Sequence, residues 1–126
     1  NTFNLLLISE LMEVDGSKGC LNELLAAILN SENRYIPNNE LKQLLHRIED
    51  DATEIYHTKY GSYDTRIKFN IDSNGDSDAV LVGRQSAKML ECIRKSIRRN
   101  LYLMQESVRA GFEGYLILCG EGINPA

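Results

Sequence analysis

The chain has 126 residues, of which 43% are hydrophobic and 25% are charged, and its formal net charge is −4. This length and balance are ordinary for a globular domain that buries its own core, which excludes a disulfide-stapled miniprotein and a low-complexity chain. The acidic balance also argues against a general nucleic-acid-binding domain, because such a domain usually carries a basic footprint.

We expect residues 1–126 to form a single domain, and the start at Asn1 suggests a piece of a larger protein. The longest apolar run near the start, residues 5–8, is too short for a signal peptide, and no run approaches the ~20 apolar residues of a membrane span. Three widely spaced cysteines, Cys20, Cys92 and Cys119, include no CxxC pair. This usage favours a reducing intracellular compartment, the cytoplasm or the nucleus.

Apolar residues at helical spacing predict three helices in the first half of the chain. They cover residues 2–14, residues 20–30, and a third stretch from Asn38 or Asn39 to about residue 59, which Gly61 should end. The third helix carries acidic side chains largely outside its apolar stripe, which predicts a solvated acidic surface. These side chains are Glu49, Asp50, Asp51 and Glu54.

The apolar period changes after residue 61. Residues 66–71 alternate polar and apolar, which is typical of a strand, and a short apolar run at 79–82 follows a polar cluster that contains Asn74-Gly75. We therefore predict a small β-hairpin over about residues 65–82, with a flexible loop between helices as the alternative. The acidic turn does not match a calcium loop, because Gly75 and Gly83 fall at its fourth and twelfth positions.

The longest predicted helix runs from about Gln85 to Ala110, with one apolar face. Residues 115–119 are apolar and follow Gly111 and Gly114, which predicts either a short buried C-terminal strand or an extension of a helix. The expected fold class is thus mainly α, a compact bundle of about four helices with the hairpin and this strand. An α+β fold is the alternative.

Charge is unevenly distributed along the chain. Residues 1–63 carry five basic and ten acidic side chains, whereas residues 64–126 carry nine basic and eight acidic ones. The positive charge gathers in the helix predicted at 85–110, opposite its apolar stripe, where it would suit an acidic partner or phosphate groups. The alternative is a solvated outer face that partly pairs with the acidic third helix. The candidate partner-binding residues are Lys88, Lys95, Arg98, Arg99 and Tyr102.

Other motifs predict no chemistry. His46 and His57 are eleven residues apart, so they share a helix face but cannot share one metal ion directly. No nucleophile motif and no phosphate-binding loop occurs, so we predict no catalytic residues, no metal and no cofactor. Two LxxLL patterns, at 21–25 and 41–45, are typical of helices that dock into a partner's groove, but the same leucines are needed for the core.

Residues 88–126 combine a helix, the glycine-punctuated apolar stretch 110–118 and a final Asn124-Pro125-Ala126. This arrangement resembles the opening half of the kink-turn RNA-binding fold, over about a third of the chain. Residues 100–104 lack the glycine-and-acid RNA-contact signature of that family. The resemblance therefore assigns no membership and only supports an RNA-binding alternative.

We predict a protein–protein interaction module, an adaptor or assembly domain, whose partner has an acidic surface. The first alternative is nucleic-acid binding, RNA above all, through the basic face of the helix at 85–110. The second alternative is an enzyme whose site is assembled from residues distant in the sequence. No membrane contact is expected, and the sequence indicates no oligomeric state.

Overall fold

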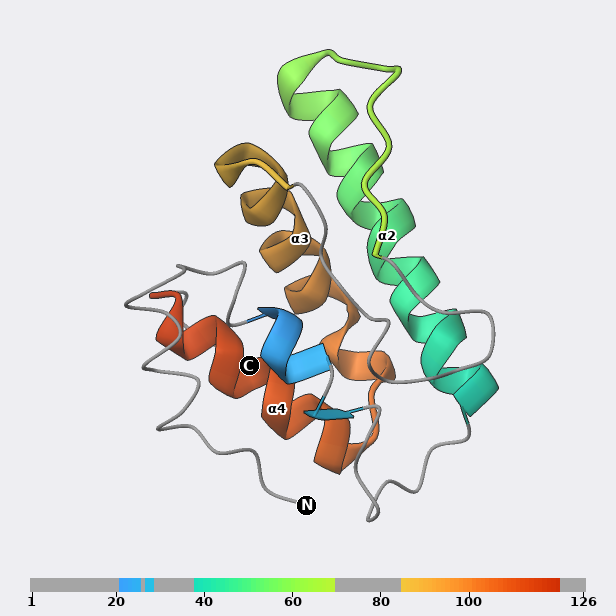
Figure 1. The fold of residues 1–126 in the computed structure, drawn as a ribbon, viewed down its shortest axis with the longest axis vertical. Coiled ribbons are helices and arrows are strands. Elements are labelled where there is room, and N and C mark those ends of the chain that lie inside the picture. Colours follow the sequence, from blue (N-terminus) through green and yellow to red (C-terminus); the bar gives the residue numbers. More distant parts are fainter. Residues whose placement is uncertain (1–20, 26, 29–37, 70–84, 121–126) are drawn as a thin grey trace.

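The computed structural model describes residues 21–25, 27–28, 38–69 and 85–120 (Figure 1). Residues 21–25 and 27–28 are helical, as predicted. They are followed by α2 (Asn38–Tyr60), α3 (Ala87–Asn100), a short 3₁₀ helix η2 (Leu101–Leu103) and α4 (Glu106–Leu118). The described part of the chain is therefore mainly helical, as the sequence predicts, and none of its residues lies in a β-strand.

Helix α2 agrees with its prediction at both ends. It ends at Tyr60, and Gly61 follows with a φ of 72°, a left-handed conformation that glycine adopts without a Cβ clash. The Gly61 N–H donates to the carbonyl of His57 at 2.9 Å, which satisfies one of the last carbonyls of the helix. The chain then turns back along α2 (Figure 1).

The single helix predicted at 85–110 is wrong, because the structure breaks it into α3, η2 and the start of α4. Ser86 caps α3 by accepting a hydrogen bond from the Met89 N–H at 3.2 Å. At the other end, Met104 and Gln105 have extended backbone angles, and Gln105 is the residue that precedes the first turn of α4. The apolar spacing runs through this break because Met104, 4% exposed, still reaches the core.

Of the two alternatives for residues 115–119, the helix is correct and the strand is wrong, since α4 continues to Leu118. Its buried side chains Val108, Phe112, Tyr115 and Leu116 follow the i, i+4, i+7, i+8 spacing of a helix. Gly111 is buried inside this helix and does not end it. The glycine-punctuated stretch 110–118, part of the segment that resembled the kink-turn RNA-binding fold, is therefore helical.

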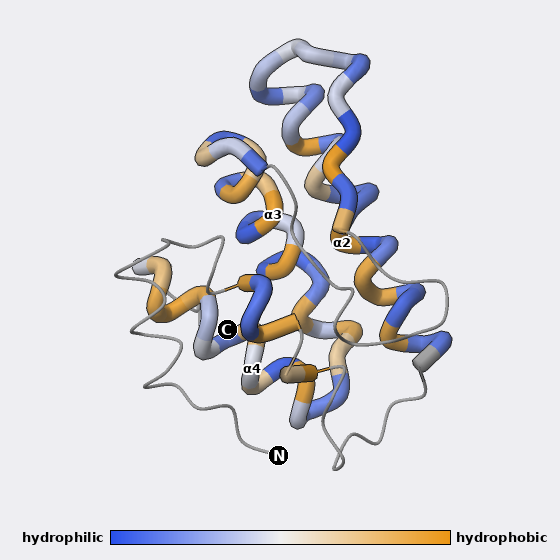
Figure 2. Tube along the Cα trace, viewed as in Figure 1, coloured by the Kyte–Doolittle hydropathy of each residue, from blue (hydrophilic) through white to orange (hydrophobic). Residues whose placement is uncertain are grey.

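The helices meet around one hydrophobic core. Helix α3 lies beside α2, and α4 crosses near the lower end of α3 (Figure 1). The hydrophobic positions of each helix alternate with hydrophilic ones around its axis, as amphipathic packing requires (Figure 2). Both LxxLL patterns belong to the core, because all their leucines are buried: Leu21, Leu24, Leu25, Leu41, Leu44 and Leu45.

The predicted hairpin is not seen in the part of the chain that the structure describes. Residues 65–69 form an extended stretch that runs back along α2 (Figure 1), but they pair with no other strand in the described part of the chain. The remainder of the hairpin, with its acidic turn and the apolar run at 79–82, lies outside the described residues, as does the helix predicted at 2–14. The polar–apolar alternation is nevertheless real, since Ile67 and Phe69 are buried while Arg66 and Lys68 are exposed.

Side chains of α2 take the place of a partner strand for this tethered segment, residues 65–69. The Phe69 N–H donates to Oε2 of Glu49 at 2.5 Å, and the Ile67 N–H donates to Oγ1 of Thr53 at 3.0 Å. His57 Nε2 donates to the Thr65 carbonyl at 2.7 Å, because a carbonyl can only accept. The segment is thus anchored at every second residue.

The spacing of these anchors follows from backbone geometry. The anchoring side chains of α2 are four residues apart, which is a rise of about 6 Å along a helix. The anchored backbone groups are two residues apart, which is about 6.6 Å along an extended chain. These two distances nearly match over the three hydrogen bonds. One face of α2 can therefore bond to alternate residues of the extended segment, while the residues between them point to solvent.

Candidate partner-binding surface beside helix α3

The contact between α2 and α3 contains polar side chains that the sequence did not single out. Cys92, Ser96 and Asn100 are buried on α3 at a spacing of four residues. Ser96 Oγ donates to the Ile48 carbonyl at 2.7 Å, and Asn100 Nδ2 donates to Oδ2 of Asp51 at 2.8 Å. The signal that was missed is this i, i+4, i+8 row of small or polar residues next to the apolar stripe.

Glu91 links the two helices near the end of α2. Its Oε1 accepts from Lys59 Nζ at 2.9 Å and from the Tyr60 hydroxyl at 2.8 Å. The hydrogen bonds from Lys59 and Tyr60 lower the pKa of the Glu91 carboxyl below its ordinary value. The same carboxylate raises the pKa values of Lys59 and of Tyr60, in each case chiefly through its hydrogen bond. Lys59 is thereby held as a charged partner of Glu91.

Lys88 is the first of the predicted partner-binding residues, and it lies at the same end of the helix pair. Its side chain is exposed, and its Nζ lies 4.9 Å from the centre of the Tyr60 ring of α2. A cation in this position is attracted to the face of the ring. Lys88 therefore leans toward α2 and does not simply extend into solvent from the outer side of α3.

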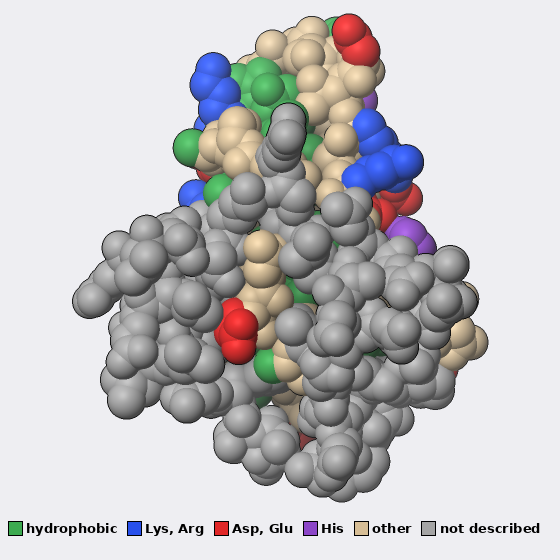
Figure 3. All heavy atoms as spheres, in the orientation of Figure 1, with side chains coloured by type: hydrophobic (Ala, Val, Ile, Leu, Met, Phe, Trp, Pro, Cys, Tyr) green, Lys and Arg blue, Asp and Glu red, His purple; other side chains and the backbone are tan. Residues whose placement is uncertain are grey.

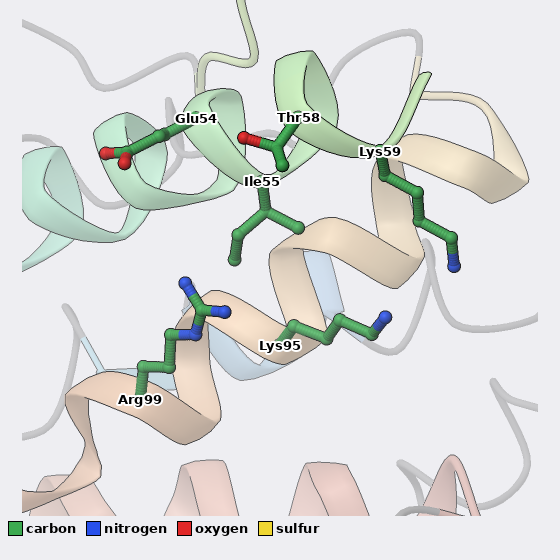
Figure 4. A pocket seen from close by; sticks show the side chains of 6 residues that line it. All are labelled: Glu54, Ile55, Thr58, Lys59, Lys95 and Arg99. Atoms are coloured by element: carbon green, nitrogen blue, oxygen red, sulfur yellow. The ribbon is translucent and has the colours of Figure 1, made fainter. Parts of the chain in front are cut away.

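Lys95 and Arg99 border a hollow of about 190 Å³ between α2 and α3 (Figure 4). Arg99 extends toward α2, and Lys95 and Lys59 both reach toward the opposite end of the hollow (Figure 4). Ile55, only 8% exposed, supplies its apolar floor. The residues that line the hollow are Glu54, Ile55, Thr58, Lys59, Lys95 and Arg99.

The other two predicted residues lie apart from this hollow. Arg98 is exposed but does not line it, since neighbouring residues are about 100° apart around a helix. Tyr102 is 76% exposed on η2, directly after α3. The structure thus places Lys88, Lys95 and Arg99 along the edge of α3 that faces α2, whereas the sequence placed all the bases on a face opposite the apolar stripe.

The acidic surface predicted on α2 is only partly correct. Asp50 and Glu54 are exposed, and Asp50 forms an ion pair with Arg66. Asp51 is half-buried and accepts from Asn100. Glu49 contradicts the prediction, because it is only 3% exposed. One of its carboxylate oxygens accepts from the Phe69 N–H, and the other accepts from His46 Nδ1 at 2.8 Å.

Cationic side chains flank both sides of the upper part of the molecule in Figure 3, where α2 and α3 lie. This end is where the Lys59–Glu91 pair and Lys88 lie. Cationic side chains are therefore visible on both sides of the helix pair in this view.

The described residues contain no group of three side chains placed to bind a metal ion. Cys92 and Cys119 form no disulfide, and burial raises the pKa of the Cys92 thiol, which makes it a poor nucleophile. Among the described helices, none combines the length and the apolar character that crossing a membrane requires. Comparisons with protein-family models, with curated proteins and with solved structures found no match.

Proposed function

We propose that this domain is a protein-binding module that recognises a partner with an acidic surface along the α2-facing edge of α3. The observation that supports this proposal is the alignment of Lys88, Lys95 and Arg99 along that edge, next to the hollow between the two helices. Tyr102, exposed beyond the end of α3, offers the kind of aromatic side chain that is enriched at protein interfaces.

Charge complementarity is the physical basis of the proposed recognition. Two of these cations, Lys95 and Arg99, form no ion pair with a carboxylate of the described residues. An acidic partner would therefore find cations that need not first give up an intramolecular ion pair. Such complementarity raises the association rate and selects among partners.

A capture experiment tests this proposal. The immobilised full chain is incubated with cell extract, with and without nuclease, and compared with a Lys95→Glu/Arg99→Glu variant. We expect a stoichiometric protein that survives nuclease and is lost in the variant, because both reversals place like charge opposite an acidic surface. A matched control, Arg47→Glu/Lys68→Glu, reverses two exposed cations elsewhere and should retain the partner.

Two results would contradict the proposal. Capture that is unchanged in the Lys95→Glu/Arg99→Glu variant would show that the partner binds elsewhere. Capture that disappears with nuclease, and that weakens steeply with added salt, would instead indicate nucleic-acid binding through the same cations.

A further inference from the structure

We infer that the hollow between α2 and α3 is a binding site for a phosphoryl group, the phosphomonoester of a phosphorylated serine or threonine in the partner protein. This inference rests on the proposed function, since that function supplies a protein as the carrier of the group. The site would be formed by Arg99 and Lys95 from α3 with Thr58 and Lys59 from α2.

The balance of charge in the hollow suits a doubly charged anion. Its lining carries three cations, Lys59, Lys95 and Arg99, and one carboxylate, Glu54. Because Lys59 is already paired with Glu91, Lys95 and Arg99 are the two cations that match the charge of the anion. A phosphomonoester carries about −1.5 to −2 charges near neutral pH, whereas a side-chain carboxylate carries one. Within the described residues no ion pair joins Glu54 to any of the three cations, so the carboxylate does not already occupy the site.

The individual side chains supply suitable donors. Arg99 presents a planar guanidinium toward the hollow (Figure 4), and such a group can donate two parallel hydrogen bonds to phosphate oxygens. Lys95 adds a compact charge from the same helix, one turn earlier. Thr58 is exposed on α2 and contributes a hydroxyl, which can donate to a third oxygen.

The pairing of Lys59 with Glu91 limits its role in this site. Because Lys59 Nζ already donates to Glu91 at 2.9 Å, it contributes mainly long-range attraction. Arg99 and Lys95 are therefore expected to provide most of the affinity. Glu54, which is exposed at the end of the hollow where Arg99 lies, should oppose binding (Figure 4).

A nucleic-acid backbone fits the same hollow less well. Helix α2 places an exposed carboxylate, Glu54, in the lining of the hollow, and the chain has a net charge of −4. These charges repel an extended polyanion, which must follow the surface for several phosphates. A single phosphoryl group needs only the small hollow itself.

A titration with a small probe tests this inference on the full chain. N-acetyl-phosphoserine N-methylamide is added to the ¹⁵N-labelled protein, and the amide shifts are followed by NMR. We expect saturable shifts at Thr58, Lys59, Lys95 and Arg99, and none of them with the unphosphorylated serine compound. The variant Arg99→Gln should weaken binding by at least about tenfold, since it removes a charged hydrogen-bond donor.

Two further variants control for general charge effects. Lys68→Gln removes an exposed cation of the tethered segment that does not line the hollow, and it should leave the affinity within about twofold because exposed charges are screened. Glu54→Gln should strengthen binding, because it removes the opposing carboxylate. Equal weakening by Arg99→Gln and Lys68→Gln, or the absence of a saturable shift, would overturn the inference.

A third ligand tests the choice of partner. A short single-stranded RNA should not compete with the phosphoserine probe for the hollow. If it binds more tightly than the probe and displaces it, the inference of a phosphoprotein partner is overturned.

Phosphatase treatment of the extract separates this inference from the proposed function. If a protein is captured through Lys95 and Arg99 but phosphatase leaves its capture unchanged, the interaction module stands and the phosphoryl site is wrong. If the probe binds the hollow with the expected variant effects but no protein is captured, the phosphoryl-group site stands and the protein-binding function is wrong.

Discussion

Helix α2 is covered on two sides by different means. Toward α3 it buries apolar residues such as Ile48 and Ala52, and two buried polar side chains of α3 bond to it. On another side it holds the tethered segment, which buries only Ile67 and Phe69.

The two sides differ in the interactions that stabilise them. A helix pair removes a long apolar stripe from water, and this burial is the main favourable term in folding. A five-residue extended segment has no partner strand in the described part of the chain, so its backbone groups must find other partners. Glu49, Thr53 and His57 supply them, and we expect the segment to depend on these few hydrogen bonds more than the helix pair depends on any one of its own.

The largest expected effect comes from the core around α3. Ile93→Ala removes a fully buried side chain, and we expect it to lower the free energy of unfolding by about 2–5 kcal/mol, because a cavity remains where the methyl and methylene groups were. Urea unfolding of the whole domain measures it. The matched control, Ile117→Ala, alters a residue that is 61% exposed and should change the stability by less than about 0.5 kcal/mol. A similar loss in both variants would contradict the assignment of the core.

A smaller and more local effect is expected in the tethered segment. Thr53→Val keeps the shape of the side chain but removes the hydroxyl that accepts from the Ile67 N–H and donates to the Glu49 carbonyl. We expect the free energy of opening of the tethered segment to fall by about 1–3 kcal/mol, the usual cost of leaving a buried hydrogen-bonding group without a partner. It should appear as faster hydrogen exchange at the Ile67 and Phe69 amides.

The exchange pattern of the wild-type chain sharpens this test. Protection should alternate, high at the tethered amides of residues 67 and 69 and low at those of 66 and 68. Thr58→Val makes the same change at an exposed position of α2 and should leave the pattern unaltered. If Thr53→Val instead accelerates exchange equally throughout α2 and α3, the segment unfolds together with the helix pair and the contrast between the two sides is wrong.

The smallest expected effect concerns the surface of the tethered segment. Arg66 forms an ion pair with Asp50, and both side chains are largely exposed. Arg66→Gln should therefore lower the free energy of unfolding by no more than about 1 kcal/mol. Urea unfolding at low and high salt should show that the difference shrinks as salt screens the pair. Lys68→Gln, an exposed cation two residues later, should show no such salt-dependent loss.

Local periodicity was sufficient to predict the helical class, α2 with its glycine end, and the buried leucines at 21–25 and 41–45. These features depend on residues within a few turns of one another, and burial of an apolar stripe is required whichever partner covers it. The candidate cations were also visible in the sequence, since their charge and helical spacing are local properties.

The tertiary structure decided how these pieces meet. The spacing of apolar residues from 85 to 110 is compatible with one helix, but in the folded domain the α-helix is interrupted at residues 101–105. Residues 115–118, which the sequence shows only as an apolar run, belong to α4. Likewise, the alternation at 66–69 predicts an extended segment but does not indicate which element it packs against. The sequence predicts Glu49 to be exposed, whereas in the structure this segment covers it. The hollow beside Lys95 and Arg99 exists only because α2 and α3 lie together. Each of these outcomes depends on contacts between residues distant in the sequence, and a local pattern does not encode them.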